Sequence, residues 1–217
     1  LMLENISPRL MEPGMPHHNC PDKEPSRRVE TIAASGRQRV PFTSGILVGI
    51  GEEPAEVIDS LFALADLASR FGSIQEIIVQ NFRAKADTRM RRDPEPTVQY
   101  FARVVAAARW ILGPTMNLQV PPNLTEDFGV DLDAVINDWG GVSPLTIDWV
   151  NPEAPWPHLE KLNRVTAERG FQLKPRLPVY PEYINDGWID PGLMPKVKSA
   201  VDAAGYALVP AMEDSSG

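Results

Sequence analysis

The stretch from Thr43 to Glu52 constrains the fold more than any other part of the chain, because an apolar, β-branched run stops there at closely spaced glycines. Gly45, Gly49 and Gly51 mark its end, and Pro54 then opens a helical pattern. Proline fits the first turn of a helix, so the stretch predicts a strand, a tight turn and a helix. The glycines either let a flat ligand reach the backbone or only permit the turn. Their order, G-x-x-x-G-x-G, differs from the dinucleotide-binding order G-x-G-x-x-G.

The rest of the chain alternates between strand-like and helix-like patterns. Apolar residues recur at helical spacing over residues 56–71, and residues 74–79 form a nearly continuous apolar run, typical of a strand buried on both faces. In chain order, strands are predicted at residues 1–5, 40–48, 74–79, 116–120 and 138–142, an extended segment at 171–177, and helices at residues 26–35, 56–71, 96–112, 125–136, 158–169 and 191–204. The alternation predicts a parallel α/β architecture, either an open doubly wound sheet or part of an eight-stranded barrel.

Length and charge limit the classes of partner. The chain has 217 residues, enough for one large domain, and its net charge of -8 argues against non-specific binding to nucleic acid or to an anionic membrane. No apolar run approaches the roughly 20 residues that span a bilayer, and no signal peptide is visible. The single cysteine, Cys20, excludes an internal disulfide framework and indicates a reducing, cytoplasmic location. Because the chain opens on a strand-like run, Leu1 to Asn5, we expect it to be the later part of a longer protein.

Polar residues follow each predicted strand. They are Glu4 and Asn5, Glu52, Gln80 and Asn81, Gln119 and Asn123, Asn137 and Asp138, and Ser143. In a barrel the carboxyl ends of the strands form the site, so these side chains should converge, although a residue at a strand end often only caps the next helix. His17, His18 and Cys20 lie close enough in sequence to suggest a metal, but a zinc site needs four ligands, and the sequence favours an ordinary loop.

Several motifs together resemble one family. Gly45-x-Leu47-x-Gly49-x-x-Glu52 resembles the G-x-I-x-G-x-x-E motif on the fifth strand of radical S-adenosylmethionine enzymes, and residues 80–88 resemble their sixth-strand segment. Nearly the whole chain, through about Trp188, is similar to the radical half of the FO synthases, which make 7,8-didemethyl-8-hydroxy-5-deazariboflavin. The matching stretches are residues 40–52, 74–82, 119–124, 136–144, 150–158 and 179–183.

The resemblance implies a fold and a reaction. Residues 1–188 would form about strands 4 to 8 of a radical S-adenosylmethionine type (β/α)8 TIM barrel, and residues 189–217 a helical or irregular extension. A 4Fe–4S cluster would cleave S-adenosylmethionine to a 5′-deoxyadenosyl radical. That radical would act on an adduct of tyrosine and 5-amino-6-ribitylamino-uracil in the biosynthesis of a deazaflavin coenzyme. The implied partner is the tyrosine-activating half of FO synthase, as a fused domain or a separate subunit.

The resemblance also assigns site residues. For S-adenosylmethionine it implies Glu4 at the ribose, Gly45, Gly49 and Gly51 at the adenosine part, Glu52 fixing that loop, Asn81 and Phe82 at the adenine, and Arg28 at the methionine carboxylate. For the substrate it implies Gln119, Asn123, Asp138, Trp139 and Ser143, with Gly140 and Gly141 leaving space for a two-ring molecule. Glu4 could instead cap its loop, Asp138 a helix, and Trp139 could fill the core.

One departure limits what the chain can do alone. The family holds its cluster with a C-x-x-x-C-x-x-C motif, and this chain has only Cys20, so no residue here is assigned as a cluster ligand. We expect the chain to be inactive by itself. A non-catalytic adenosine-binding barrel domain is the alternative. A barrel enzyme that uses Glu52 and Glu53 is disfavoured, because adjacent residues usually point apart.

Overall fold

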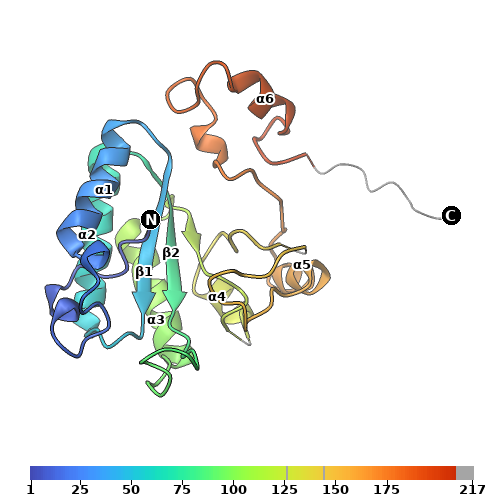
Figure 1. Ribbon diagram of the computed structural model, residues 1–217. Helices are drawn as coiled ribbons and strands as arrows, with labels where there is room; N and C mark the ends of the chain where they lie inside the picture. Colours follow the sequence, from blue (N-terminus) through green and yellow to red (C-terminus); the bar gives the residue numbers. More distant parts are fainter. Residues whose placement is uncertain (126, 144, 209–217) are drawn as a thin grey trace.

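The computed structural model describes residues 1–125, 127–143 and 145–208, which form an α/β structure around a parallel sheet (Figure 1). The sheet has three strands in the order β1 (Phe42–Val48), β2 (Ile74–Asn81) and β3 (Leu118–Gln119). β1 and β2 pair in parallel, with Gly45 opposite Ile78, and β2 pairs with β3 through Ile78 and Gln119. The predicted parallel α/β class is confirmed.

Two isolated bridges extend this sheet at both edges. Glu4 pairs in parallel with Ile46 of β1, and Asp138 pairs in parallel with Gln119 of β3. The five predicted strand positions are therefore neighbours in chain order, an arrangement compatible with an arc of a barrel. The first and fifth are single bridges rather than strands. The backbone leaves the extended conformation at Glu4, with φ of 65°, and at Gly140, with φ of 78°.

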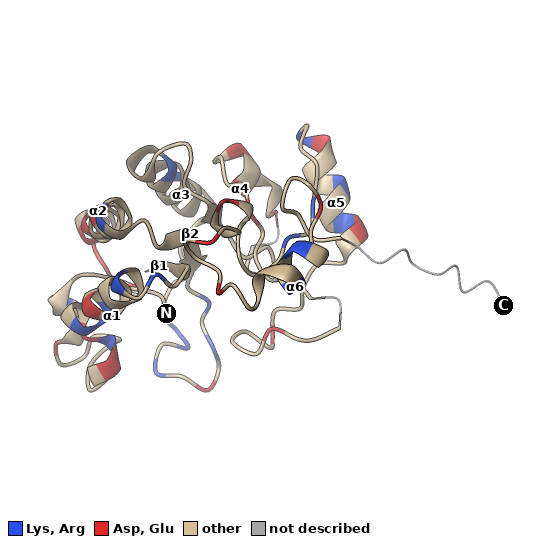
Figure 2. Ribbon diagram, turned by 90° about the horizontal axis from the view of Figure 1, so that it is seen from above, with Lys and Arg blue, Asp and Glu red and all other residues tan. Residues whose placement is uncertain are grey.

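Helices cover the outer side of the sheet. Seen from above, α1 (Pro25–Arg37), α2 (Pro54–Phe71), α3 (Val98–Leu112), α4 (Gly129–Asp133) and α5 (Leu159–Glu168) follow one another along an arc outside the strands (Figure 2). α2 ends at Gly72, whose φ of 63° is left-handed, as its glycine predicts. The core between helices and strands includes Ile46, Leu61, Leu64, Ile77, Val105 and Leu118.

Shorter elements complete the fold. The 3₁₀ turns η1 (Pro8–Met11) and η2 (Pro21–Lys23) precede α1, and η3 (Pro181–Tyr183) and α6 (Met194–Ser199) follow α5. Tyr183 donates a hydrogen bond from its hydroxyl to the Gly72 carbonyl oxygen at 2.9 Å, so η3 lies beside the amino-terminal end of β2. No helix among the described residues is both long enough and apolar enough to cross a bilayer.

Some predicted boundaries were wrong for identifiable reasons. α1 continues through Gly36, where any Cβ would lie 2.4 Å from the Phe71 Cβ, so this glycine serves close helix packing rather than a helix end. The helix predicted at residues 125–136 is only α4, and Thr125 does not cap it. Residues 171–177 form no strand, and the helix predicted at 191–204 is α6, which spans Met194–Ser199.

The buried carboxyl group of Asp131 on α4 should make the stability of the chain depend on pH. Asp131 is 2% exposed, and its Oδ2 has no hydrogen-bond partner. Burial, together with the charge of Asp127, raises the pKa of Asp131 to about 7. Between about pH 4 and about pH 7 the Asp131 carboxyl therefore keeps its proton in the folded state and loses it in the unfolded state. The free energy of unfolding consequently falls as the pH rises through this range.

Asp131→Asn should remove this pH dependence. The expected gain in unfolding free energy at pH 8 is at most about 4 kcal/mol, since one pKa unit corresponds to about 1.4 kcal/mol. Urea titrations at pH 5 and pH 8 measure it, with Asp59→Asn on the exposed face of α2 as the control. Equal pH slopes for the chain and for Asp131→Asn would contradict the prediction.

Candidate functional site at the carboxyl ends of the strands

The glycine-rich turn after β1 is held by its own acid. Gly49 and Gly51 both have φ of 97°, which favours glycine. The Glu52 carboxylate accepts hydrogen bonds from the backbone N–H of Gly49 at 2.6 Å and of Ile50 at 2.7 Å. Glu52 therefore fixes the turn, as expected from the sequence.

The three glycines differ in what surrounds them. A Cβ on Gly45 would lie 2.1 Å from the Ile78 carbonyl oxygen, and one on Gly49 would lie 2.6 Å from Pro96 Cδ. Packing within the chain is thus sufficient to explain these two glycines. A Cβ on Gly51 would meet only Met15, at 3.8 Å, so packing does not explain this glycine, whose carbonyl oxygen accepts a hydrogen bond from Arg9 Nη2 at 2.9 Å.

Glu4 lies in a cluster of cations beside β1. His17 Nε2 and Arg28 Nη1 each lie 3.1 Å from the Glu4 carboxylate, and Lys23 donates a hydrogen bond to it. Burial alone would raise the pKa of Glu4, but hydrogen bonds from His17 and Lys23 and the charges of Lys23 and Arg28 hold it at about 2. The carboxylate is therefore ionised, and chain partners already occupy both its oxygens.

Arg28 is a structural partner of this cluster. It is 5% exposed, and it donates to the carbonyl oxygens of Met2 and Asp22 as well as to Glu4. The structure therefore pairs Arg28 with Glu4, so the contact with a methionine carboxylate stays a prediction. His17 likewise serves Glu4, and no group of three or more potential metal ligands occurs among the described residues.

A pocket of about 340 Å³ opens at the carboxyl ends of β1 and β2. Leu47, Gln80, Asn81 and Phe82 line it, and Arg83, Lys85 and Arg89 add positive charge at its rim. Asn81 is 7% exposed; its Nδ2 donates to the Leu124 carbonyl oxygen at 3.0 Å, and its Oδ1 has no partner. The pocket thus contains an aromatic side chain and, beside it, an amide whose oxygen is buried without a partner among the described residues.

The residues after β3 divide between the pocket side and the sheet. Asn123 Nδ2 donates to Asp148 Oδ2 and to the Ala154 carbonyl oxygen, both at 2.9 Å. Gln119 is buried, and a Cβ on Gly140 would lie 2.1 Å from its Nε2. The side chain of Gln119 therefore occupies the space over Gly140, whereas a Cβ on Gly141 would meet nothing within 4 Å, and space for a two-ring substrate there stays a prediction.

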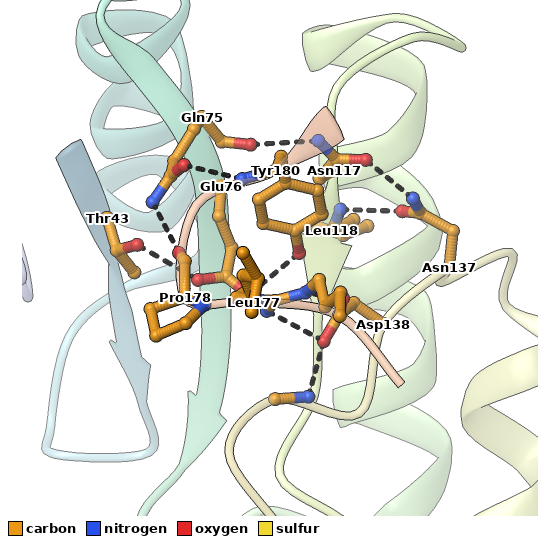
Figure 3. Close-up of polar contacts among 12 residues, drawn as sticks. Thr43, Gln75, Glu76, Asn117, Leu118, Asn137, Asp138, Leu177, Pro178 and Tyr180 are labelled. Atoms are coloured by element: carbon orange, nitrogen blue, oxygen red, sulfur yellow. Dashed lines mark hydrogen bonds and ion pairs between the residues drawn. The ribbon is translucent and has the colours of Figure 1, made fainter. Parts of the chain in front are cut away.

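Asp138 belongs to a polar network on the inner face of the sheet (Figure 3). Asp138 Oδ1 accepts from the Gly140 N–H at 2.5 Å, and its carboxylate receives two hydrogen bonds from Arg176, from Nε at 2.5 Å and from Nη2 at 3.1 Å. Arg176 Nη2 also donates to Glu76 at 2.9 Å. Both oxygens of Asp138 are thus used within the chain, so a substrate contact through them stays a prediction.

Tyr180 and Thr43 complete this network. The Tyr180 hydroxyl donates to Glu76 Oε1 at 2.9 Å, and Thr43 Oγ1 donates to Glu76 Oε2 at 3.0 Å. The Arg176 guanidinium lies 4.0 Å from the centre of the Tyr180 ring. Burial, followed by the charge of Asp138, raises the pKa of Glu76, and Arg176 counteracts that rise.

Two further predicted substrate residues lie elsewhere than expected. Trp139 is 5% exposed, packs edge-to-face on Phe128 at 5.4 Å, and donates its indole N–H to Thr166 at 3.1 Å. Trp139 thus packs in the core, the alternative that the sequence left open, and its contact with the substrate stays a prediction. Ser143 Oγ accepts from the N–H groups of Leu145 and Thr146, so it shapes its own turn.

Sequence reasoning missed Glu76, Lys23 and Arg176, and it named Arg28 for a ligand rather than as a partner of Glu4. Glu76 could have been noticed, because it is a charged residue inside an otherwise apolar strand. Lys23 and Arg176 gave no such signal. Lys23 ends the short turn η2 and Arg176 lies in an irregular segment, 19 and 38 residues from their acidic partners Glu4 and Asp138. Only the folded chain brings them together.

Comparison with known proteins gives this site a context. No family model matches the chain. The FO synthase of Streptomyces avermitilis is 51% identical over 208 residues, which are 94% of this chain and 24% of that protein. The 7,8-didemethyl-8-hydroxy-5-deazariboflavin synthase of Methanopyrus kandleri is 47% identical over 208 residues, 95% of this chain and 62% of that protein. The FO synthase of Mycobacterium tuberculosis is 46% identical over 209 residues, again 94% and 24%.

These matches define the class of the protein. An α/β chain that is about half identical to deazariboflavin synthases over nearly its whole length is a homologue of those enzymes. The resemblance seen in the sequence is confirmed, and the chain corresponds to a segment of FO synthase. It spans about a quarter of the length of the Streptomyces avermitilis relative and about three fifths of the Methanopyrus kandleri relative.

Arg176→Met tests the network around Asp138. The substitution leaves two carboxylates on the inner face without their cation, and breaking a buried pair in this way costs about 3 kcal/mol of unfolding free energy. The pKa of Glu76 should rise further, so the loss should be greater at pH 8 than at pH 5. Urea titrations at the two pH values measure both effects.

The control for this experiment is Arg70→Met, which removes an exposed ion pair with Asp66 at 3.2 Å and should cost less than about 1 kcal/mol. Adding Glu76→Gln to Arg176→Met should restore part of the stability at pH 8. A loss no greater than that of Arg70→Met, or no recovery in the double variant, would show that the network contributes little.

Proposed function

We propose that this chain is the part of a radical S-adenosylmethionine deazaflavin synthase that binds the adenosine of S-adenosylmethionine and the substrate. In this proposal it supplies strands 4 to 8 of a (β/α)8 barrel within residues 1–188, and residues 189–217 form an extension. The observation that carries the proposal is the 51% identity to an FO synthase over 94% of the chain. The five parallel strand positions in chain order support it.

The pocket residues fit the adenosine part of S-adenosylmethionine. Phe82 lines the pocket, Asn81 Oδ1 is a buried acceptor without a partner among the described residues, and the space beside Gly51 is free of close side chains. When bound with its cluster, S-adenosylmethionine would supply one-electron chemistry that removes a hydrogen atom from the substrate. The residues of this chain would orient the adenosine and shield it from water, with Glu52 keeping the turn in place.

The residues present do not fit the 4Fe–4S cluster. Such a cluster needs three cysteine thiolates in this family, and the sequence holds only Cys20, which lies in the loop before η2. The reaction on the tyrosine-derived adduct, and the tyrosine-activating half as a partner, belong to the proposal for the longer protein. The low coverage of the bacterial relatives is compatible with a fused partner.

The 217-residue chain alone should take up no 4Fe–4S cluster. After anaerobic treatment with iron and sulfide, followed by desalting, we expect no charge-transfer absorbance in the visible range, because three thiolates are lacking. The Cys20→Ser variant serves as the baseline. A stable cluster spectrum from the unaltered chain that Cys20→Ser lacks would contradict the assignment.

Phe82→Ala tests the adenosine site without any cluster. The probe is 5′-deoxyadenosine, and its affinity for the chain is measured by calorimetry. Stacking of a base on an aromatic ring contributes about 1–3 kcal/mol, so the variant should bind about tenfold more weakly or worse. Phe62→Ala, at a 57% exposed position on α2, is the matched control and should bind as the original chain does. Unchanged binding by Phe82→Ala would remove the adenine assignment.

A further inference from the structure

The loop of residues 145–150 exposes an unusual amount of apolar surface. Leu145 is 92% exposed, Trp149 81%, Val150 65% and Ile147 50%. Isolated exposed apolar residues are common, but four large ones within six residues form a patch of the kind that marks a binding surface.

The backbone of this loop is nevertheless anchored. Asp148 Oδ2 accepts from Asn123 Nδ2 at 2.9 Å and from Asn151 Nδ2 at 3.1 Å, and its Oδ1 accepts from the Val150 N–H at 2.9 Å. Burial would raise the pKa of Asp148, but these hydrogen bonds hold it below its ordinary value. Lys85 donates to the Val150 carbonyl oxygen from the opposite side. The loop is thus fixed with its apolar side chains turned to solvent.

The anchored loop borders the carboxyl-end pocket. Val150 and Asn151 line that pocket together with Phe82 and Met90, and Lys85 contributes to the lining as well. Asn123, which binds Asp148, follows β3, so the loop is attached to the same edge of the sheet as the pocket. Val150 belongs both to the apolar patch and to the lining of the pocket, so the patch adjoins the pocket.

We propose that residues 145–150 are a ring-binding loop, in which Trp149 stacks on a planar heteroaromatic ring of the substrate at the mouth of the pocket. The inference rests on the proposed function and names a specificity-determining residue for it. An indole is a large, rigid apolar surface with few rotamers to lose, and it binds planar rings by stacking. Asp148 is the positioning residue, because it holds the backbone on both sides of Trp149.

Riboflavin is the probe, because it joins a planar nitrogen heterocycle to a ribityl chain and its fluorescence reports stacking. In titrations of the 217-residue chain, Trp149→Ala should weaken riboflavin binding about tenfold or more, while Trp149→Phe should retain most of it. Trp110→Ala is the matched control, since Trp110 is 89% exposed on α3, on the outer side of the sheet. Asp148→Asn should weaken riboflavin binding while leaving the unfolding midpoint nearly unchanged.

Two outcomes would overturn the ring-binding loop. One is riboflavin binding that is absent, or equal in Trp149→Ala and in the original chain. The other is a dimer in sedimentation equilibrium that Trp149→Ala converts to monomer, which would make the patch an interface between copies. Titration with 5′-deoxyadenosine separates this inference from the proposed function. If the chain does not bind 5′-deoxyadenosine but binds riboflavin in a way that depends on Trp149, only the adenosine site is refuted. If it binds 5′-deoxyadenosine but its riboflavin binding does not depend on Trp149, only the ring-binding loop is refuted.

Discussion

The close approach of β1 to β2 is the constraint on which the rest of the structure depends. At Gly45 the backbones leave no room for a side chain, because a Cβ there would lie 2.1 Å from the Ile78 carbonyl oxygen. This contact sets the parallel register, and the register brings the glycine-rich turn beside the end of β2. Phe82 then donates its N–H to the Val48 carbonyl oxygen at 2.7 Å. The pocket at the carboxyl ends of the strands thus depends on a glycine three residues before the end of β1.

The sequence could predict this much because the signals are local. Apolar periodicity placed α2 and β2, and glycines after apolar runs marked the turn at Gly49 and the end of α2 at Gly72. The same rule failed at Gly36, where a glycine inside α1 makes room for Phe71. Local patterns cannot distinguish a glycine that ends a helix from one that lets a neighbouring element approach, because the deciding atom belongs to another helix.

The candidate site was only partly predictable for a related reason. The acids at strand ends were visible, but their cations lie 19 to 38 residues further along the chain, in a 3₁₀ turn, in a helix and in an irregular segment. Glu4 finds Lys23 and Arg28, and Asp138 finds Arg176. A buried carboxylate needs such partners, and which residue supplies them depends on the path of the loops. The sequence thus indicates which buried carboxylate needs a cationic partner, but it does not indicate which residue is that partner.

On the inner face of the sheet, the network of Glu76 and Asp138 and the pocket occupy different levels along the strands. Arg176 and Tyr180 reach Glu76, the third residue of β2, whereas the pocket begins at Gln80, four residues further towards the carboxyl end. Side chains on one face of a strand advance about 7 Å for every two residues, so the network lies well below the pocket. Asp138 is held within that lower layer, where its oxygens are already bonded. A ligand in the pocket would therefore contact Phe82, Asn81 and the anchored loop around Asp148 rather than Asp138. Recognition of a ring is thus better assigned to these residues at the carboxyl ends of the strands than to the network around Asp138.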